Sequence, residues 1–142
     1  MVIRVAAMQI PDYWEAIKYA IDQVSSYSPE RRQEVLNKYL IKLLCEEMQC
    51  WFLLNSKRHI KTLIITELTN TYQTIEINLV IAYGFTPSNT EEKQEWFSIL
   101  DRWAENINAK RILACTPHAR VGEILQDYGF KLRDFVYMKE RR

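Results

Sequence analysis

Residues 74–115 carry the feature that most constrains the fold, because they place a strand, a helix and a second strand in immediate succession. Residues 74–82 are an apolar, β-branched run that predicts a strand, and residues 91–107 return to helical spacing. Residues 111–115 predict another short strand. A helix that joins two strands of one sheet makes those strands parallel. The sequence therefore predicts an α/β (α+β) chain in which helices flank a sheet.

The residues before this crossover predict one strand, two helices and two more strands. Residues 2–7 predict the first strand, and helices begin at Pro11 and Pro29, since proline is tolerated in the first helical turn. Residues 49–55 and 60–68 predict two strands joined by a short polar connection. Together with the first strand of the crossover they form an antiparallel meander.

The residues after the crossover predict one more helix and one more strand. Thr116 and Pro117 suit the N-cap and the first position of a helix, and Gly129 suits its left-handed C-terminal end. Residues 130–139 alternate well enough to predict a last strand. The predicted order is β-α-α-β-β-β-α-β-α-β, in one domain (residues 1–142) with a mixed, mostly antiparallel sheet.

The composition excludes several classes of protein. A chain of 142 residues is long enough for one core, and a formal net charge of +1 favours neither nucleic acid nor an anionic membrane. No apolar run approaches the roughly 20 residues of a membrane span. Cys45, Cys50 and Cys115 match no zinc or redox spacing, so we expect free thiols in a cytoplasmic protein and no metal site.

The element order resembles that of the GNAT superfamily of acyl-CoA-dependent N-acyltransferases. Two short motifs support the resemblance: the opening Ile3-Arg4 with Pro11-Asp12, and the Gly129-Phe130 pair after the last helix. The resemblance covers nearly the whole chain. The resemblance implies that acetyl-CoA or another acyl-CoA is the co-substrate and lies where the fourth and fifth strands splay apart. An amine then attacks the thioester, and no metal takes part.

The resemblance also implies a binding site for the pyrophosphate at the start of the helix after residue 90, where backbone N–H groups suit an anion. The family's glycine-rich loop is missing, since Gly84 is the only glycine between residues 82 and 95. Asn89 and Glu92 instead predict a capping box, and Glu91 and Glu92 place like charge beside a diphosphate. The family pattern assigns the acyl-CoA contacts to Ala82, Tyr83, Gly84, Phe85, Asn89, Thr90 and His118.

Two residues are the candidates for catalysis. Glu76 is the candidate general base, because bases of the family often lie on the fourth strand, and Glu67 on the third strand is a weaker one. The family's usual proton-donating Tyr falls on Leu125, which has no proton to donate. Tyr128, one helical turn away, is the candidate general acid in its place. For each of these residues a purely structural role stays open.

Three functions follow as alternatives. The first is an N-acyltransferase with a divergent phosphate loop and an unidentified amine acceptor. The second is a non-catalytic GNAT-fold binding or structural module, phage-encoded or part of a larger assembly. The third is an enzyme that uses this fold with another donor. A protein partner or a homo-oligomer is open in each case, because four tryptophans and eight tyrosines leave room for an aromatic interface.

Overall fold

A five-stranded sheet forms the centre of the computed structural model, which describes residues 1–141. In chain order the helices and strands are β1 (Val2–Val5), α1 (Ile10–Val24), α2 (Arg32–Leu44), β2 (Met48–Leu54), β3 (Ile60–Thr71), β4 (Thr74–Gly84), α3 (Thr90–Asn106), β5 (Arg111–Ala114) and α4 (Ala119–Asp127). The strand order is β1-β2-β3-β4-β5. Neighbours from β1 to β4 are antiparallel, and β5 is parallel to β4. The predicted fold class, a mixed and mostly antiparallel sheet with a helical crossover, is confirmed.

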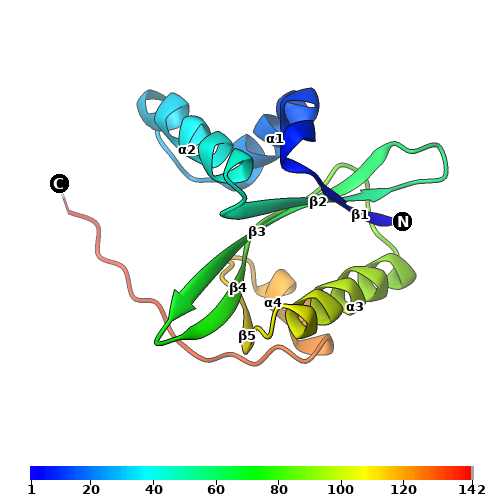
Figure 1. Ribbon diagram of the computed structural model, residues 1–142. Helices are drawn as coiled ribbons and strands as arrows, with labels where there is room; N and C mark the ends of the chain where they lie inside the picture. Colours follow the sequence, from blue (N-terminus) through cyan, green and yellow to red (C-terminus); the bar gives the residue numbers. More distant parts are fainter. Residues whose placement is uncertain (142) are drawn as a thin grey trace.

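The helices lie on both faces of the sheet, with α1 and α2 on one face and α3 on the other (Figure 1). All seven residues of β2 are buried between these layers. Phe52 packs in the cluster of the α1–α2 face, whereas Trp51 packs with Trp96 of α3 on the other. A strand covered on both faces favours a nearly continuous apolar run, which is why this strand shows no regular alternation in the sequence. Burying each large apolar side chain contributes about 1.5–3 kcal/mol.

A β-bulge in β4 changes which face its side chains occupy. The register passes from Ile65 opposite Ile81 to Thr66 opposite Leu79, which leaves Val80 as the extra residue. Leu79 packs with the α3 cluster, while both Val80 and Ile81 pack with the α1–α2 cluster. A bulge of this kind bends the strand and re-aims the side chains that follow it.

The end of α4 agrees with the sequence and its start does not. Gly129 has φ +90°, and the N–H of Phe130 bonds to the carbonyl of Leu125 at 3.1 Å, as a Schellman motif requires. Thr116 was expected to cap the helix, but the N-cap is His118. The Thr116 hydroxyl instead accepts the His118 N–H at 3.1 Å, because a short polar side chain readily closes a local turn.

The expected last strand over residues 130–139 is not formed. Every residue from 131 to 141 is exposed, and none has strand pairing in the part of the chain that the structure describes. A strand exists only where a neighbouring strand satisfies its N–H and C=O groups, and β5 is the last strand of the sheet. The prediction was wrong because the residue pattern favours a strand, whereas no neighbouring strand pairs with this segment in the described part of the chain.

Candidate active site

β4 and β5 separate at the bulge. Their parallel pairing runs from Glu76 opposite Arg111 to Leu79 opposite Ala114, and stops there. β4 continues to Gly84 and stays paired with β3 on its other side. The edge of residues 80–84 that turns toward β5 therefore has no strand partner among the described residues. This is the place where the resemblance puts an acyl-CoA.

The N-terminus of α3 lies just beyond this edge and is capped by its own side chains. The Asn89 side chain accepts the backbone N–H of Glu92 at 2.8 Å, and the Glu92 carboxylate accepts the backbone N–H of Asn89 at 3.0 Å. The predicted capping box is therefore confirmed. The N–H groups of Thr90 and Glu91 in the first turn have no intrahelical acceptor and point out of the helix end. The helix end thus offers an anion fewer donors than an uncapped one.

Lys61 of β3 neutralises one of the two acids at this helix end. Its ammonium nitrogen lies 2.7 and 2.8 Å from the two carboxylate oxygens of Glu92, and both side chains are about four-fifths buried. Its hydrogen bond and that of the Asn89 N–H hold the pKa of Glu92 below its ordinary value. Of the two acids, Glu91 is exposed and has no ion-pair partner among residues 1–141. The sequence shows Lys61 only as part of a polar hairpin, 31 residues from its partner, so it carried no hint of this contact.

Glu76, the candidate base, is buried near the start of β4 with 7% of its surface exposed. One carboxylate oxygen lies 3.3 Å from a guanidinium nitrogen of Arg111, whose own side chain is 60% exposed. The contact leaves other lone pairs of the carboxylate free to accept a proton. Glu67, the weaker candidate, instead lies 2.6 Å from the ammonium of Lys42 on α2. Glu76 is therefore the acid beside the β4–β5 pairing, four residues before the bulge.

The structure does not bring Tyr128 to Glu76. The Tyr128 ring stacks on Phe97 of α3, with ring centroids 4.2 Å apart. Phe130 meets the Phe97 ring edge-on, with centroids 5.8 Å apart. No hydrogen bond of its hydroxyl occurs among the described residues. Leu125 is half-buried on the same helix. The role of Tyr128 as general acid stays a prediction.

Three of the remaining predicted contacts, Tyr83, Gly84 and Phe85, lie at the end of β4. Tyr83 and Phe85 lie edge-to-face at 5.1 Å, and Tyr19 of α1 joins them with centroids 5.8 and 6.0 Å away. Tyr19 was missed from the sequence because it lies off the buried stripe of its helix. A methyl group on Gly84 would come within 3.2 Å of a backbone oxygen, so the chain turns tightly here. His118 lies at the start of α4, where it is exposed.

The described part of the chain holds neither a membrane-spanning helix nor a cluster of metal ligands. No helix in residues 1–141 is long and apolar enough to cross a membrane. No three His, Cys, Asp or Glu side chains over the same residues are grouped to hold a metal ion.

Known structures of similar fold match the chain from end to end. No protein-family model and no curated protein sequence matches it. A predicted acetyltransferase from Clostridium acetobutylicum, solved with acetyl-CoA, has a TM-score of 0.73 and 14% identity over 98% of this chain and 95% of that one. AAC(6')-Iy, solved with the bisubstrate analogue CoA-S-monomethyl-acetylneamine, has a TM-score of 0.70 and 10% identity over 100% and 97%.

A third match is the aminoglycoside antibiotic 6'-N-acetyltransferase AAC(6')-Ih from Acinetobacter baumannii. Its TM-score is 0.67 with 11% identity, over 100% of this chain and 98% of that one. At such identities the likeness concerns the backbone, since most side chains differ. The chain has the fold of the GNAT acetyltransferases.

Proposed function

We propose that the protein transfers an acyl group from acyl-CoA to the amine of an acceptor. The observation that carries the proposal is the separation of β4 from β5 at the Val80 bulge, in a chain that matches acetyltransferases along its whole length. Two of those structures are described with CoA-containing ligands. The unpaired edge of residues 80–84 offers backbone N–H and C=O groups to the amides of an extended pantetheine arm.

In the proposed reaction the amine nitrogen forms a bond to the thioester carbon, and the carbon–sulfur bond then breaks. The nitrogen loses a proton to the Glu76 carboxylate, directly or through one water, and the thiolate of CoA takes up a proton from Tyr128 or from solvent. The contact with Arg111 at 3.3 Å limits the rotation of the Glu76 carboxylate. A carboxylate held in one orientation suits a base that must accept a proton from an ammonium or amine.

The proposed phosphate site is weaker than a glycine-rich loop would provide. The N–H groups of Thr90 and Glu91 and the dipole of α3 attract an anion, by about 0.3–2 kcal/mol. The exposed Glu91 opposes them, whereas Lys61 cancels the charge of Glu92. We therefore expect acyl-CoA to bind, with an affinity that depends on salt.

A thermal-shift titration with acetyl-CoA tests the proposal. Ligand at 100 times its Kd adds about 2.7 kcal/mol of stability, which corresponds to a rise of roughly 6–10 °C in the midpoint. Pantetheine and ADP are tested separately. The thermal shift with pantetheine reports binding at the unpaired strand edge, and the shift with ADP reports binding at the helix end. No shift with acetyl-CoA or a longer acyl-CoA at millimolar concentration would leave the non-catalytic module as the better account.

Release of free thiol from acetyl-CoA, followed over a panel of amines, then tests catalysis. Glu76→Gln is expected to lower turnover at least tenfold while the thermal shift with acetyl-CoA persists. Glu76→Asp, which keeps the carboxylate but shortens the side chain, should retain more turnover than Glu76→Gln. Equal turnover in Glu76→Gln and the parent would remove Glu76 as the base.

A further inference from the structure

The hairpin end of β3 and β4 carries polar side chains on the face of the sheet where α1 and α2 lie. Glu67 of β3 is opposite Asn78 of β4, and two residues further along Thr69 is opposite Glu76. The ammonium nitrogen of Lys42 on α2 lies 2.6 Å from a Glu67 carboxylate oxygen, so these side chains share the face of α2. Figure 1 shows the hairpin running out past both helices. A polar face beside the candidate base gives an acceptor amine a place to bind.

Two oxygen atoms on this face can accept the hydrogen bonds of an amine. Glu76 has lone pairs that its contact with Arg111 does not use. The Asn78 amide donates to the Thr69 hydroxyl at 2.9 Å, and its own carbonyl oxygen has no partner among residues 1–141. Residues two apart on a strand are about 7 Å from each other, so an amine between Glu76 and Asn78 can bond to both side chains. This position lies next to the point where β4 and β5 separate.

Arg111 presents unused donors beside the same position. One nitrogen of its guanidinium lies 3.3 Å from Glu76, and a guanidinium has five N–H donors in all. No other hydrogen bond of this side chain occurs in the part of the chain that the structure describes, and 60% of its surface is exposed. The guanidinium fork matches the two oxygens of a carboxylate. An acceptor with an amine and a carboxylate on the same carbon can therefore contact Glu76 and Arg111 together.

The charges on this face cancel. Glu67 is paired with Lys42, and Glu76 is paired with Arg111. An acceptor with several ammonium groups finds no surplus of negative charge at these two pairs, and its further charges are repelled by Lys42 and Arg111. A zwitterion, which has one charge of each sign, matches the arrangement. The two pairs thus favour an amino acid over a polyamine.

We propose that the acceptor is a small α-amino acid and that Arg111 binds its carboxylate. The inference rests on the proposed acyl transfer with Glu76 as base, and it adds the class of acceptor and a residue that selects it. The amine nitrogen bonds to the thioester carbon and loses its proton to Glu76, and the carbon–sulfur bond breaks with its electron pair on sulfur. The carboxylate takes no part in these bond changes. The product, an N-acyl amino acid, lacks the ammonium charge that Glu76 attracts, which favours its release.

The preference of the parent protein among acceptors is the first test. Free thiol released from acetyl-CoA is followed with L-alanine, L-alaninamide and spermidine. L-Alanine and L-alaninamide differ in the carboxylate alone, and the amine of the amide is the less basic, so the amide would react faster if the carboxylate were not bound. We expect kcat/KM to be at least tenfold higher for L-alanine. An equal or higher value for L-alaninamide or spermidine would refute the amino acid while acyl transfer stands.

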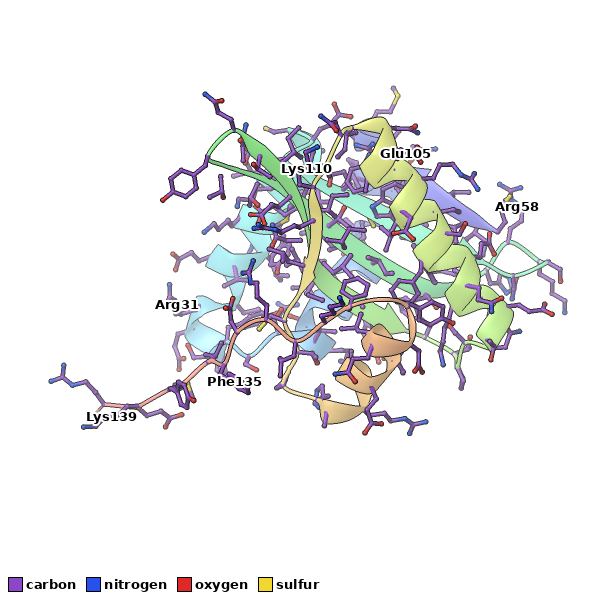
Figure 2. All side chains as sticks on the ribbon, turned by 90° about the horizontal axis from the view of Figure 1, so that it is seen from below. Arg31, Arg58, Glu105, Lys110, Phe135 and Lys139 are labelled. Atoms are coloured by element: carbon purple, nitrogen blue, oxygen red, sulfur yellow. The ribbon has the colours of Figure 1, made fainter. Side chains whose placement is uncertain are left out.

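Arg111→Gln separates binding of the carboxylate from support of Glu76. It should lower kcat/KM for L-alanine at least tenfold, mainly by raising KM, and leave the rate with L-alaninamide within about twofold. Arg111→Lys keeps the charge without the fork and should lie between Arg111→Gln and the parent. Lys110→Gln is the matched control and should change neither rate, because Lys110, labelled in Figure 2, is an exposed cation directly before β5. An equal fall with both acceptors in Arg111→Gln would mean that Arg111 acts only through Glu76.

Binding without an acyl donor distinguishes a failure of this inference from a failure of the proposed function. Proton–nitrogen correlation NMR, with and without CoA, should show shifts at residues 76–78 and 111 when L-alanine is added. L-Alaninamide should not produce these shifts, and Arg111→Gln should abolish them. If L-alanine binds in this way but no amine releases thiol, the amino acid site stands and acyl transfer is wrong. If amines release thiol but L-alanine neither binds nor is preferred, acyl transfer stands and the amino acid is wrong.

Discussion

Glu92→Gln is expected to tighten the binding of acyl-CoA about fivefold. In the native chain the Lys61 ammonium lies 2.7 and 2.8 Å from the Glu92 carboxylate oxygens, so the pair has no net charge. The glutamine keeps the reciprocal cap with Asn89, because Gln is as suitable as Glu at this position of a capping box. The substitution therefore leaves the helix start in place and changes the net charge of the pair to +1.

The size of the effect follows from the distance between this charge and a phosphate. One unit charge about 6 Å from another contributes roughly 0.7–2.8 kcal/mol for effective dielectric constants between ~80 and ~20. Salt at about 0.1 M screens a partly exposed pair further. About 1 kcal/mol remains, which is close to a fivefold change in Kd.

Titration calorimetry or the thermal shift with acetyl-CoA measures this change at two salt concentrations. Asp22→Asn is the control, because it also removes the acid from an ion pair, that with Arg32, but far from α3. The gain in affinity should shrink at high salt and be absent for pantetheine, which carries no pyrophosphate. An affinity that Glu92→Gln leaves unchanged, in a protein that binds acetyl-CoA, would show that the phosphates do not lie at this helix end.

The same variant has a defined effect on stability. Because the folded-state pKa of Glu92 is lowered, its contribution is fully present above the unfolded value of about 4.3 and is lost as pH falls through the folded value. Glu92→Gln should therefore be about 1 kcal/mol less stable than the parent at pH 7, and the difference should narrow below about pH 4. Urea unfolding at pH 7 and pH 3.5 measures both. A difference that is equal at the two pH values would mean that the ion pair is not its source.

Four further variants test the backbone and the core. Gln73→Gly should raise the free energy of unfolding by about 1 kcal/mol in urea, because φ at this hairpin residue is +65° and glycine adopts that value without strain. Gly129→Ala should lower the free energy of unfolding by about 1 kcal/mol, since φ at Gly129 is +90°. Gly122→Ala inside α4 should raise it, because the added methyl group meets no atom within 4 Å. If both substitutions changed the free energy of unfolding in the same direction, the left-handed end of α4 at Gly129 would be contradicted. Thr66→Val should lower the free energy of unfolding by about 1–3 kcal/mol, because the buried hydroxyl accepts the indole N–H of Trp51 at 3.0 Å and donates to the Gln49 side chain at 2.8 Å. An unchanged free energy of unfolding would show that Trp51 and Gln49 find other partners.

Much of the fold could be predicted because its causes are local. The order of elements as far as α4 follows from the change between the helical and the strand period, which needs no knowledge of distant contacts. The capping box of Asn89 and Glu92 and the left-handed Gly129 are likewise properties of a few adjacent residues. These features were predicted, and the structure confirms them.

The features that could not be predicted depend on residues far apart in the chain. Lys61 reaches Glu92 only because β3 lies next to the start of α3, so the charge at that helix end could not be judged from Glu91 and Glu92 alone. The bulge at Val80 lies within an apolar run, where an extra residue leaves no mark on the pattern. The last strand was predicted from its own residues, whereas a strand is defined by its neighbour.

The bulge at Val80 also determines on which face of the sheet the later side chains of β4 lie. Since side chains alternate with period two, the same sequence paired to β3 without the bulge would exchange the two faces from that point on. Tyr83 and Phe85 would turn from α1 toward α3, and Ala82 would take their place. Deleting Val80 itself would instead remove the bulge and restore regular alternation, so Tyr83 and Phe85 would stay on the side of α1.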